Sequence, residues 1–312
     1  MVIIILRKNK KFFRFFLDWL LNIDVSNESS SGDGINSFRL AVFIAFHFGC
    51  FAVFWVGFSW FAFIFAVILY FMRMFFITAF YHRYFSHRSY KTSRVIQFLM
   101  AIMGCTAGQR GPIWWSSHHR EHHITSDTID DPHSPRFGFF NSHMLWFLKT
   151  KNFKILKHRV KDWLRYPELV ILEYIDWIPF LSFGVFCYVI GELSILSHYG
   201  VQTSGIQLFV WGFIVSTVML YHGTYTINSL AHRFGKKRYE TNDDSKNNFF
   251  LALLTLGEGW HNNHHRYPRS AKQGFFWWEI DLTYFFLKFM KLIFLIKDLE
   301  QVPPNIVSQK RI

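Results

Sequence analysis

Two kinds of residue are scarce in this sequence, and each scarcity excludes a class of protein. The 312 residues contain only three cysteines, which lie far apart in apolar stretches: Cys50, Cys105 and Cys187. Neither a disulfide framework nor a cysteine metal motif is therefore expected. Acidic residues number 21 against 34 Lys and Arg, which gives a net charge of +13. The basic residues are spread through loops beside apolar segments, which indicates attraction to an anionic membrane leaflet rather than to nucleic acid.

The first residues also lack a signal-peptide cleavage site, and their apolar stretch is short. Residues 1–37 begin with a basic, aromatic stretch and continue over 26–37 with a polar run rich in Ser, Gly and Asn. We expect a cytoplasmic segment with an interfacial helix near residues 12–21, followed by a flexible linker.

Apolar side chains, in contrast, are abundant, with 51% hydrophobic and 21% aromatic residues. This composition is typical of a lipid-facing protein. Because about 20 residues cross the hydrocarbon core, the apolar segments predict two helical hairpins with spans at about 38–57, 60–80, 169–190 and 206–226. The predicted fold is thus an all-α integral membrane protein with four transmembrane helices, in a membrane domain over 38–296 followed by a tail over 297–312.

Charged residues inside these spans are few. Arg73 lies within the second span, where a charge is costly unless it faces protein or water. The third span is weakened by three residues: Glu173, Asp176 and Pro179. Two further apolar segments, 95–107 and 275–296, predict helices that lie on or dip into the membrane.

The distribution of Lys and Arg predicts the orientation. The segments 1–40, 81–168 and 229–312 hold 33 of the 34 basic residues. The positive-inside rule then places both termini and the long central loop in the cytoplasm. We expect a multi-pass membrane protein with its histidine clusters on the cytoplasmic side.

Nine of the sixteen histidines form four clusters, all on the predicted cytoplasmic side: His82 and His87; His119, His122 and His123; His232; and His261, His264 and His265. Imidazole is a preferred ligand of iron, zinc and copper. A single cluster is more often only a polar helix face. Nine clustered histidines on one side of one membrane exceed the needs of one metal ion and predict a two-metal site at the membrane surface.

The spacing within the clusters assigns some of these ligands. His119 and His123 share a helix face and can hold one metal, whereas His122 lies about 100° from His123 and can reach a second. His82 and His87 are five residues apart, so their helix must unwind or bend near 84–86 to bring them together. Asn228 lies about one turn before His232 and is well placed to hold a metal-bound water.

The type of metal is less constrained. Zinc takes four ligands and no thiolate is offered, whereas many imidazoles with open positions suit two irons that react with dioxygen. Copper is not excluded by the ligands, and Glu121 is the obvious carboxylate in the clusters. His118 and His133 are candidates for orienting the ligands, while four other histidines are interpreted as structural or solvated: His47, His158, His198 and His222.

The sequences around the clusters resemble a known family. They are His82-Arg-Tyr-Phe-Ser-His87, His119-Arg-Glu-His122-His123, Asp131-Pro-His133-Ser-Pro-Arg136, Asn228-Ser-Leu-Ala-His232 and Gly257-Glu-Gly-Trp-His261-Asn-Asn-His264-His265. Within about 38–295, the chain resembles the membrane fatty acyl desaturases of the stearoyl-CoA desaturase type.

The resemblance implies a four-span protein with a cytoplasmic cap over a di-iron centre. One iron would be held by His82, His87, His119, His123 and His265. The other would be held by His122, His232, His261 and His264, with a water fixed by Asn228. The implied reaction is the O2-dependent removal of two hydrogens from a saturated acyl chain, which leaves a cis double bond, by family default at Δ9.

The resemblance also bears on the substrate. Tyr70 and Met74, about three and two turns before His82, are predicted to cap the acyl tunnel, although a core or lipid-facing role is equally open. Acyl-CoA members often carry Arg-Asp where this chain has Ser117 and His118, a variant more like bacterial relatives. Acyl-CoA is the expected carrier, although another carrier is open, and its phosphates would have three candidate partners: Arg136, Lys149 and Lys151.

The chain contains no His-Pro-Gly-Gly heme-binding segment. We therefore expect a separate electron donor, either a b-type cytochrome or a ferredoxin with its reductase. Two other functions stay open at this point. One is a di-iron fatty acid or alkane hydroxylase, and the other is a membrane metal transporter or storage protein.

Overall fold

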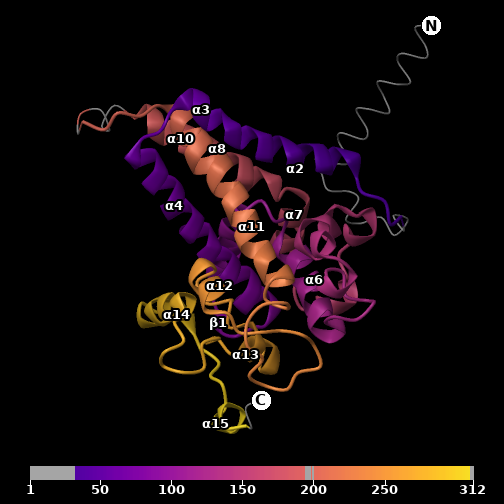
Figure 1. Ribbon diagram of the computed structural model, residues 1–312. Coiled ribbons are helices and arrows are strands. Elements are labelled where there is room, and N and C mark those ends of the chain that lie inside the picture. The colour runs from indigo at the N-terminus through magenta and orange to yellow at the C-terminus, as the bar shows by residue number, and fades with distance from the viewer. Residues whose placement is uncertain (1–31, 194–197, 199, 310–312) are drawn as a thin grey trace, which may run out of the picture.

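Helices dominate the fold, as the sequence predicts (Figure 1). The computed structural model describes residues 32–193, 198 and 200–309. The interfacial helix expected near residues 12–21 lies outside the described residues, as does the first half of the expected linker, 26–31.

Three helices of the described chain are long and apolar enough to cross a membrane. The first, Ser37–Val56, comprises α2 (Ser37–Gly49), a 3-10 turn (Cys50–Ala52) and α3 (Val53–Val56). The second, Trp60–Ser86, comprises α4 (Trp60–Phe75) and a π-helical segment (Phe76–Ser86). The third, Gly205–Ser229, comprises α10 (Gly205–Leu208), a π-helical segment (Phe209–Val215) and α11 (Ser216–Ser229).

Each of these helices begins at a polar N-cap, because the first backbone N–H groups of a helix need an acceptor. The side-chain oxygens of Asn36, Ser59 and Ser204 accept these bonds. Gly57, with a φ of 74°, ends the first helix in a left-handed conformation that glycine adopts without strain. The glycine at the end of the first helix and the serine cap of the second account for the tight turn of the first predicted hairpin.

The predicted third span, at about 169–190, is broken into two helices near the residues that weaken it in the sequence. The chain forms α7 (Pro167–Tyr174) and α8 (Trp177–Glu192), which are bent by 67° relative to each other. Two acidic residues, Glu173 and Asp176, lie at the break and are buried. The fold has four candidate spans when this bent pair counts as one.

Arg73 is fully buried among the spans, as its cost in lipid requires. Its guanidinium donates to the hydroxyls of Ser216 (2.5 Å) and Thr217 (2.8 Å) and to the carbonyl of Thr106 (3.2 Å). It also lies 4.4 Å from the ring centroid of Phe183. Arg73 thereby connects three of the helical segments by hydrogen bonds inside the bundle.

A chain of imidazoles joins α2 to the rest of the bundle. The Nε2 atoms of His47 and His222 are 3.0 Å apart, and Nδ1 of His222 is 3.0 Å from Nε2 of His143. His143 in turn contacts the hydroxyl of Ser229 at 2.9 Å. His47 and His222 therefore have a structural role, because their contact connects the first span to α11.

Shorter helices gather at one end of the long ones (Figure 1). They are α5 (Arg94–Cys105), α6 (Pro112–Thr125), α12 (Phe249–Leu254), α13 (His261–Arg266), α14 (Leu282–Leu292) and α15 (Pro304–Val307). A two-stranded sheet of β1 (Lys91–Thr92) and β2 (Ile296–Lys297) closes this cap. The helix expected over 275–296 is confined to α14, whose exposed face carries Phe285, Phe286 and Phe289.

Candidate metal centre

The fold brings all nine clustered histidines together at the junction of the spans and the cap. His82 and His87 lie at the end of the second span, and His232 follows α11. The other six lie on α6 and α13. Their ring nitrogens form two groups, and within each group one ligand atom per residue lies within 4.8 Å of all the others.

The first group contains His82, His87, His119, His123 and His264. Its Nε2 atoms lie 2.8 Å apart between His87 and His119, 3.0 Å between His119 and His123, and 2.9 Å between His123 and His264. The Nε2 atoms of His82 and His264 are 3.0 Å apart. Two nitrogens bound side by side to one metal at about 2.1 Å each would lie about 3.0 Å apart, so this group fits a metal ion.

The second group contains His122, His232, His261 and His265. The Nε2 atoms of His232 and His261 are again 3.0 Å apart. The resemblance had implied the reverse positions for His264 and His265, and the structure corrects this. On α13, His261 and His265 are four residues apart and share a face, with ring centroids 4.4 Å apart. His264 therefore points to the other group.

His82 and His87 converge because the end of the second span is wound more widely than an α-helix. The backbone N–H of His87 bonds to the carbonyl of His82 at 3.2 Å, an i to i+5 pattern. This π-helical winding puts residues five apart one turn apart, a feature that often occurs at functional sites. The predicted unwinding near 84–86 is thus a widening of the helix over Phe76–Ser86.

Carboxylates orient the histidines from behind. The Nδ1 atoms of His122, His232 and His265 contact Asp131 (3.0 Å), Asp127 (2.8 Å) and Asp243 (2.7 Å), and Nδ1 of His82 contacts Glu258 (2.5 Å). A proton on Nδ1 that is donated to a carboxylate leaves the Nε2 lone pair free for a metal.

Sequence reasoning did not assign these carboxylates. Asp131 and Glu258 lie within the quoted motifs, but Asp127 and Asp243 carry no local signal in the sequence. Glu121, the carboxylate that the sequence singled out, instead pairs with Arg159 and His158.

The protonation states suit metal ligands, which must be neutral. Burial, and then repulsion by neighbouring imidazoles, lowers the pKa well below its ordinary value in five of the histidines: His87, His119, His123, His261 and His264. Burial also lowers the pKa of His265 to about 4, against the opposing pull of Asp243. For His122, burial lowers the pKa, but the charge of Asp131 outweighs it and the net shift is upward.

The helix that carries three of the ligands is fixed at its N-terminus by a distant carboxylate. Glu173 of α7 accepts hydrogen bonds from the backbone N–H groups of Ile113 (2.5 Å) and Trp114 (3.3 Å) at the start of α6. A Cβ at Gly111 would lie so close to this carboxylate that the Glu173 side chain would have to move. The break in the third span thus serves to position α6.

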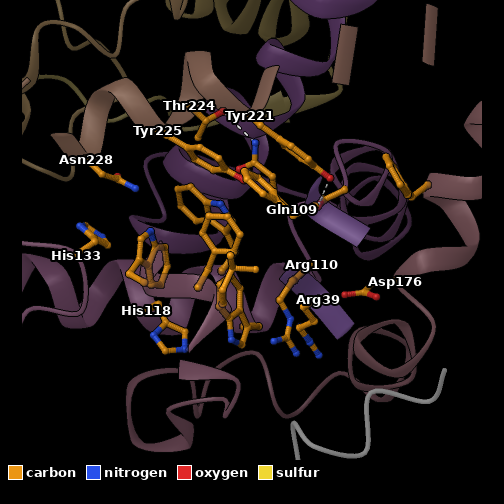
Figure 2. A pocket seen from close by; sticks show the side chains of 18 of the residues that line it. Arg39, Gln109, Arg110, His118, His133, Asp176, Tyr221, Thr224, Tyr225 and Asn228 are labelled. Atoms are coloured by element: carbon orange, nitrogen blue, oxygen red, sulfur yellow. Dashed lines mark hydrogen bonds between the residues drawn. The ribbon is translucent and has the colours of Figure 1, made fainter. Parts of the chain in front are cut away.

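An apolar cavity of about 250 Å³ lies beside the histidines (Figure 2). His133 and Asn228 lie in its wall at one end. His119 also lines it. A smaller cavity of about 40 Å³ continues past the histidines and reaches Met74. The two cavities share four wall residues, Trp115, His119, Thr224 and Asn228, so they adjoin each other beside the clustered histidines.

The structure brings only some of the predicted substrate residues to these cavities. Met74 lies in the wall of the smaller cavity and is buried. Tyr70 is buried behind Met74, where both side chains pack against Gly223 and the Tyr70 hydroxyl donates to the carbonyl of Leu254 at 2.8 Å.

The three basic residues expected at the carrier face carboxylates instead and do not line either cavity. Arg136 pairs with Asp244 at 2.7 Å. Lys149 and Lys151 lie 3.8 Å and 2.9 Å from Asp33.

His118 and His133, the predicted orienting residues, have different positions. The His118 Nε2 contacts the carbonyl of Lys154 at 3.0 Å, away from the ligands. His133 packs on His122 with ring centroids 4.2 Å apart, and its Nδ1 lies 3.6 Å from Asp131. Only His133 is thus placed to influence a ligand directly.

Membrane-length helices, buried imidazole pairs and an adjoining apolar cavity define a candidate membrane metalloprotein, and comparisons with known proteins agree with this class. The fatty acid desaturase family model matches residues 58–284. An acyl-CoA 5-desaturase of Anemone leveillei is 36% identical over 222 residues, which are 71% of this chain and 66% of the relative.

Two cyanobacterial relatives are acyl-lipid desaturases. An sn-2 palmitoyl-lipid 9-desaturase of Nostoc sp. is 32% identical over 222 residues, 70% of this chain and 73% of the relative. An sn-1 stearoyl-lipid 9-desaturase of Synechocystis sp. is 34% identical over 230 residues, 71% of this chain and 66% of the relative. The chain belongs to the fatty acid desaturase family, which confirms the resemblance seen in its sequence.

Proposed function

We propose that this protein is an O2-dependent fatty acyl desaturase that introduces a cis double bond, at Δ9, into a saturated acyl chain. The observation that carries the proposal is that imidazoles of both groups line a small cavity that adjoins a larger apolar one. The family and its acyl-chain relatives support the same conclusion.

The ligand set supports two irons, one in each imidazole group. Neutral imidazole nitrogens are good iron ligands, and the carboxylates behind them offset part of the metal charge. Irons bound in this way would supply the oxidising power that, with O2 and two electrons, removes two hydrogens from adjacent methylenes. Asn228, at the shared wall of both cavities, is proposed to hold a water beside the second group.

The task of the protein residues is to position the chain. Two adjacent methylenes offer no group for acid–base catalysis, so the site selects them by the depth to which the chain enters. The apolar walls also exclude bulk water, and the side chains of Trp115 and Thr224 border both cavities. We propose that the two cavities form one acyl path and that Met74 closes its far end.

The proposed membrane orientation and the proposed electron donor rest on the sequence analysis. The positive-inside rule supports a cytoplasmic metal centre and cytoplasmic termini in a bacterial inner membrane. Electrons are proposed to come from a separate b-type cytochrome or ferredoxin system. The sequence favoured acyl-CoA as carrier, yet the relatives include both acyl-CoA and acyl-lipid desaturases.

Product analysis tests this proposal against hydroxylation, the rival that uses the same kind of centre. Expression in a host that lacks unsaturated fatty acids is expected to yield monounsaturated chains. Mass analysis is expected to locate the double bond at carbon 9. The proposal would be overturned if hydroxylated chains were the main product, or if protein fully loaded with iron formed no alkene.

The length of the path predicts chain selectivity. Replacing Met74 with alanine removes the side chain at the closed end, so the preferred substrate should lengthen by about two carbons. Gas chromatography of products from mixed chains of 14 to 20 carbons measures the change. The conservative substitution Met74→Leu is the matched control and should retain the wild-type profile. An unchanged product profile in Met74→Ala would show that another residue limits the chain.

A further inference from the structure

A basic surface lies against the helix that carries three of the metal ligands. Residues 149–165 contain seven Lys and Arg but only one acidic residue, Asp162. This segment lies beside α6 (Figure 1), and its 3-10 helix Lys157–Arg159 packs on α6. Three basic side chains of the segment are exposed and form no ion pair within the part of the chain that the structure describes. They are Lys157, Lys161 and Arg165, and we call them the basic patch.

The charge of the cap is distributed unevenly between the two imidazole groups. The positive-inside rule accounts for basic residues on the cytoplasmic side, but not for their concentration in one place there. The segments that supply carboxylates to the second group, 127–131 and 240–244, hold three acidic residues each and no Lys or Arg. Asp130 and Glu240 in these segments are exposed. The surface beside the second group is therefore acidic, in contrast to the basic surface at α6.

The basic segment also contacts the end of the second span, next to a ligand of the first group. Trp163 of this segment is buried, and its indole Nε1 donates to the carbonyl of Phe85 at 2.6 Å. Arg120 of α6 donates to the same carbonyl at 2.7 Å. Phe85 lies two residues before His87, which belongs to the first imidazole group. One hydrogen bond and two peptide units thus connect the Trp163 indole to a residue that can bind a metal.

The supply of electrons is the step that such a surface serves. Each double bond consumes one O2, two electrons and two protons. The two hydrogens removed from the acyl chain and the two protons leave with the oxygen atoms as two water molecules. A one-electron carrier protein is therefore oxidised twice for each double bond. Because electron transfer is faster along short bonded paths than across gaps, electrons should enter where a partner can approach a metal ligand through bonded atoms.

We infer that the basic patch is the docking surface of an acidic one-electron carrier protein, and that electrons enter at the first imidazole group through Trp163 and the Phe85 carbonyl. This inference rests on the proposed desaturase function. Opposite charges steer the two proteins together and fix their orientation, whereas the acidic segments 127–131 and 240–244 repel the electron carrier from the second group. The charge distribution thus selects one of the two imidazole groups as the entry point.

Binding of defined electron carriers tests the surface. The full chain is placed in nanodiscs of zwitterionic lipid, so that lipid charge neither attracts nor repels the electron carrier. The probes are a soluble [2Fe–2S] ferredoxin and the soluble domain of a b5-type cytochrome, both of strongly negative net charge. Surface plasmon resonance measures the dissociation constant. We expect at least one probe to bind, and its binding to weaken steeply between about 0.05 M and about 0.3 M salt, because salt screens exposed charges.

Charge reversal locates the docking surface. The triple substitution Lys157→Glu, Lys161→Glu and Arg165→Glu should weaken binding of the probe at least about tenfold at low salt, mainly through slower association. It should also flatten the dependence of binding on salt. Neither effect requires bound iron, so both are measured with and without it.

A second triple variant is the matched control, because it changes the net charge by the same amount outside residues 149–165. It carries Lys236→Glu, Arg269→Glu and Lys272→Glu. Its binding should weaken far less than that of the patch variant. Equal losses in the two variants would show that the probe responds only to total charge, and would overturn the docking surface.

Trp163→Phe tests the entry route. The substitution keeps an aromatic ring but removes the N–H that bonds the Phe85 carbonyl. Binding of the probe and iron content should stay unchanged, whereas oxidation of the reduced probe by iron-loaded protein, followed by stopped-flow absorbance without O2 or acyl substrate, should slow several-fold. Trp277→Phe, at a tryptophan that is 88% exposed, is the control and should leave the rate unchanged. An unchanged rate in Trp163→Phe would overturn the entry route.

The outcomes separate this inference from the proposed function. If neither probe binds, or if the patch variant binds as well as the unaltered protein, the docking surface is disproved while the desaturase proposal stands. Protein that oxidises the probe but forms no alkene would instead count against the proposed function. If the patch variant does not fold, as judged by gel filtration, carbodiimide cross-linking of the unaltered protein decides. Cross-links from carboxylates of the probe to Lys157 or Lys161 support the surface, and cross-links only to lysines elsewhere overturn it.

Discussion

Replacing His123 with alanine is expected to abolish desaturation and to lower the bound metal by about one ion per chain. His123 Nε2 lies at 3.0 Å from His119 and 2.9 Å from His264, in the middle of the first imidazole group. Alanine removes a donor that neither neighbour can replace, and binding of metal requires the complete ligand set. Metal analysis of purified protein and product formation in cells measure the two effects.

The control is His158→Ala, because His158 has a 58% exposed side chain, lies in a short 3-10 helix (Lys157–Arg159) and belongs to neither imidazole group. It should retain both metal and activity. Asp131→Asn tests the orienting carboxylates and should reduce metal affinity or activity by about 10- to 100-fold, an intermediate effect. A His123→Ala protein that keeps full metal content and activity would disprove the assignment.

The same approach tests how the ligands divide between the groups. His264→Ala should perturb the metal that His123→Ala perturbs, whereas His265→Ala should perturb the other one. Mössbauer spectra of iron-57 protein can distinguish two inequivalent irons. If the His264 and His265 variants show identical spectral changes, the two histidines do not bind different metals, and the division into two imidazole groups is contradicted.

Local spacing predicted the grouping of the imidazoles better than the family resemblance did. The i, i+4 rule correctly paired His119 with His123 and separated His122. Applied to His261 and His265, the same rule would have paired them too, as α13 does. The reversed assignment of His264 and His265 came from the family pattern, which does not encode the rotation of a six-residue helix.

The parts that sequence did not predict depend on contacts between distant segments. The break in the third span occurs because Glu173 reaches the N-terminus of α6, a partner about 60 positions earlier in the chain. The carboxylates Asp127 and Asp243 were missed because each lies in a loop and gains its role only from a histidine on another element. The positions of the long helices, in contrast, could be predicted. They depend on the lengths of apolar segments, which can be read directly from the sequence.

The second large effect is expected at Glu258, which joins the metal ligands to the buried core. Its Oε2 contacts Nδ1 of His82 at 2.5 Å and accepts from Gln273 at 2.7 Å, and its Oε1 accepts from Arg83 at 3.1 Å. Arg83 is fully buried and also bonds Asp281 at 2.9 Å. Burial opposes the charge of Glu258, but His82 and Arg83 outweigh it and hold its pKa below the ordinary value.

Glu258→Ala leaves a buried guanidinium with half of its countercharge and His82 without its orienting partner. Removal of one partner from a buried ion pair typically costs about 3–5 kcal/mol, and loss of an orienting carboxylate weakens metal binding by about 10- to 100-fold. We therefore expect a lower thermal midpoint in detergent together with weaker iron binding, measured by competition with a chelator.

Asp281→Asn separates these two consequences, because Asp281 bonds Arg83 but makes no recorded contact with a metal ligand in the described chain. It should lower the thermal midpoint while leaving iron affinity close to that of the unaltered protein. The difference between the two variants then isolates the contribution that Glu258 makes through His82. If both variants lose stability and iron affinity to the same extent, the carboxylate acts only on the fold, and the orientation of His82 does not depend on it.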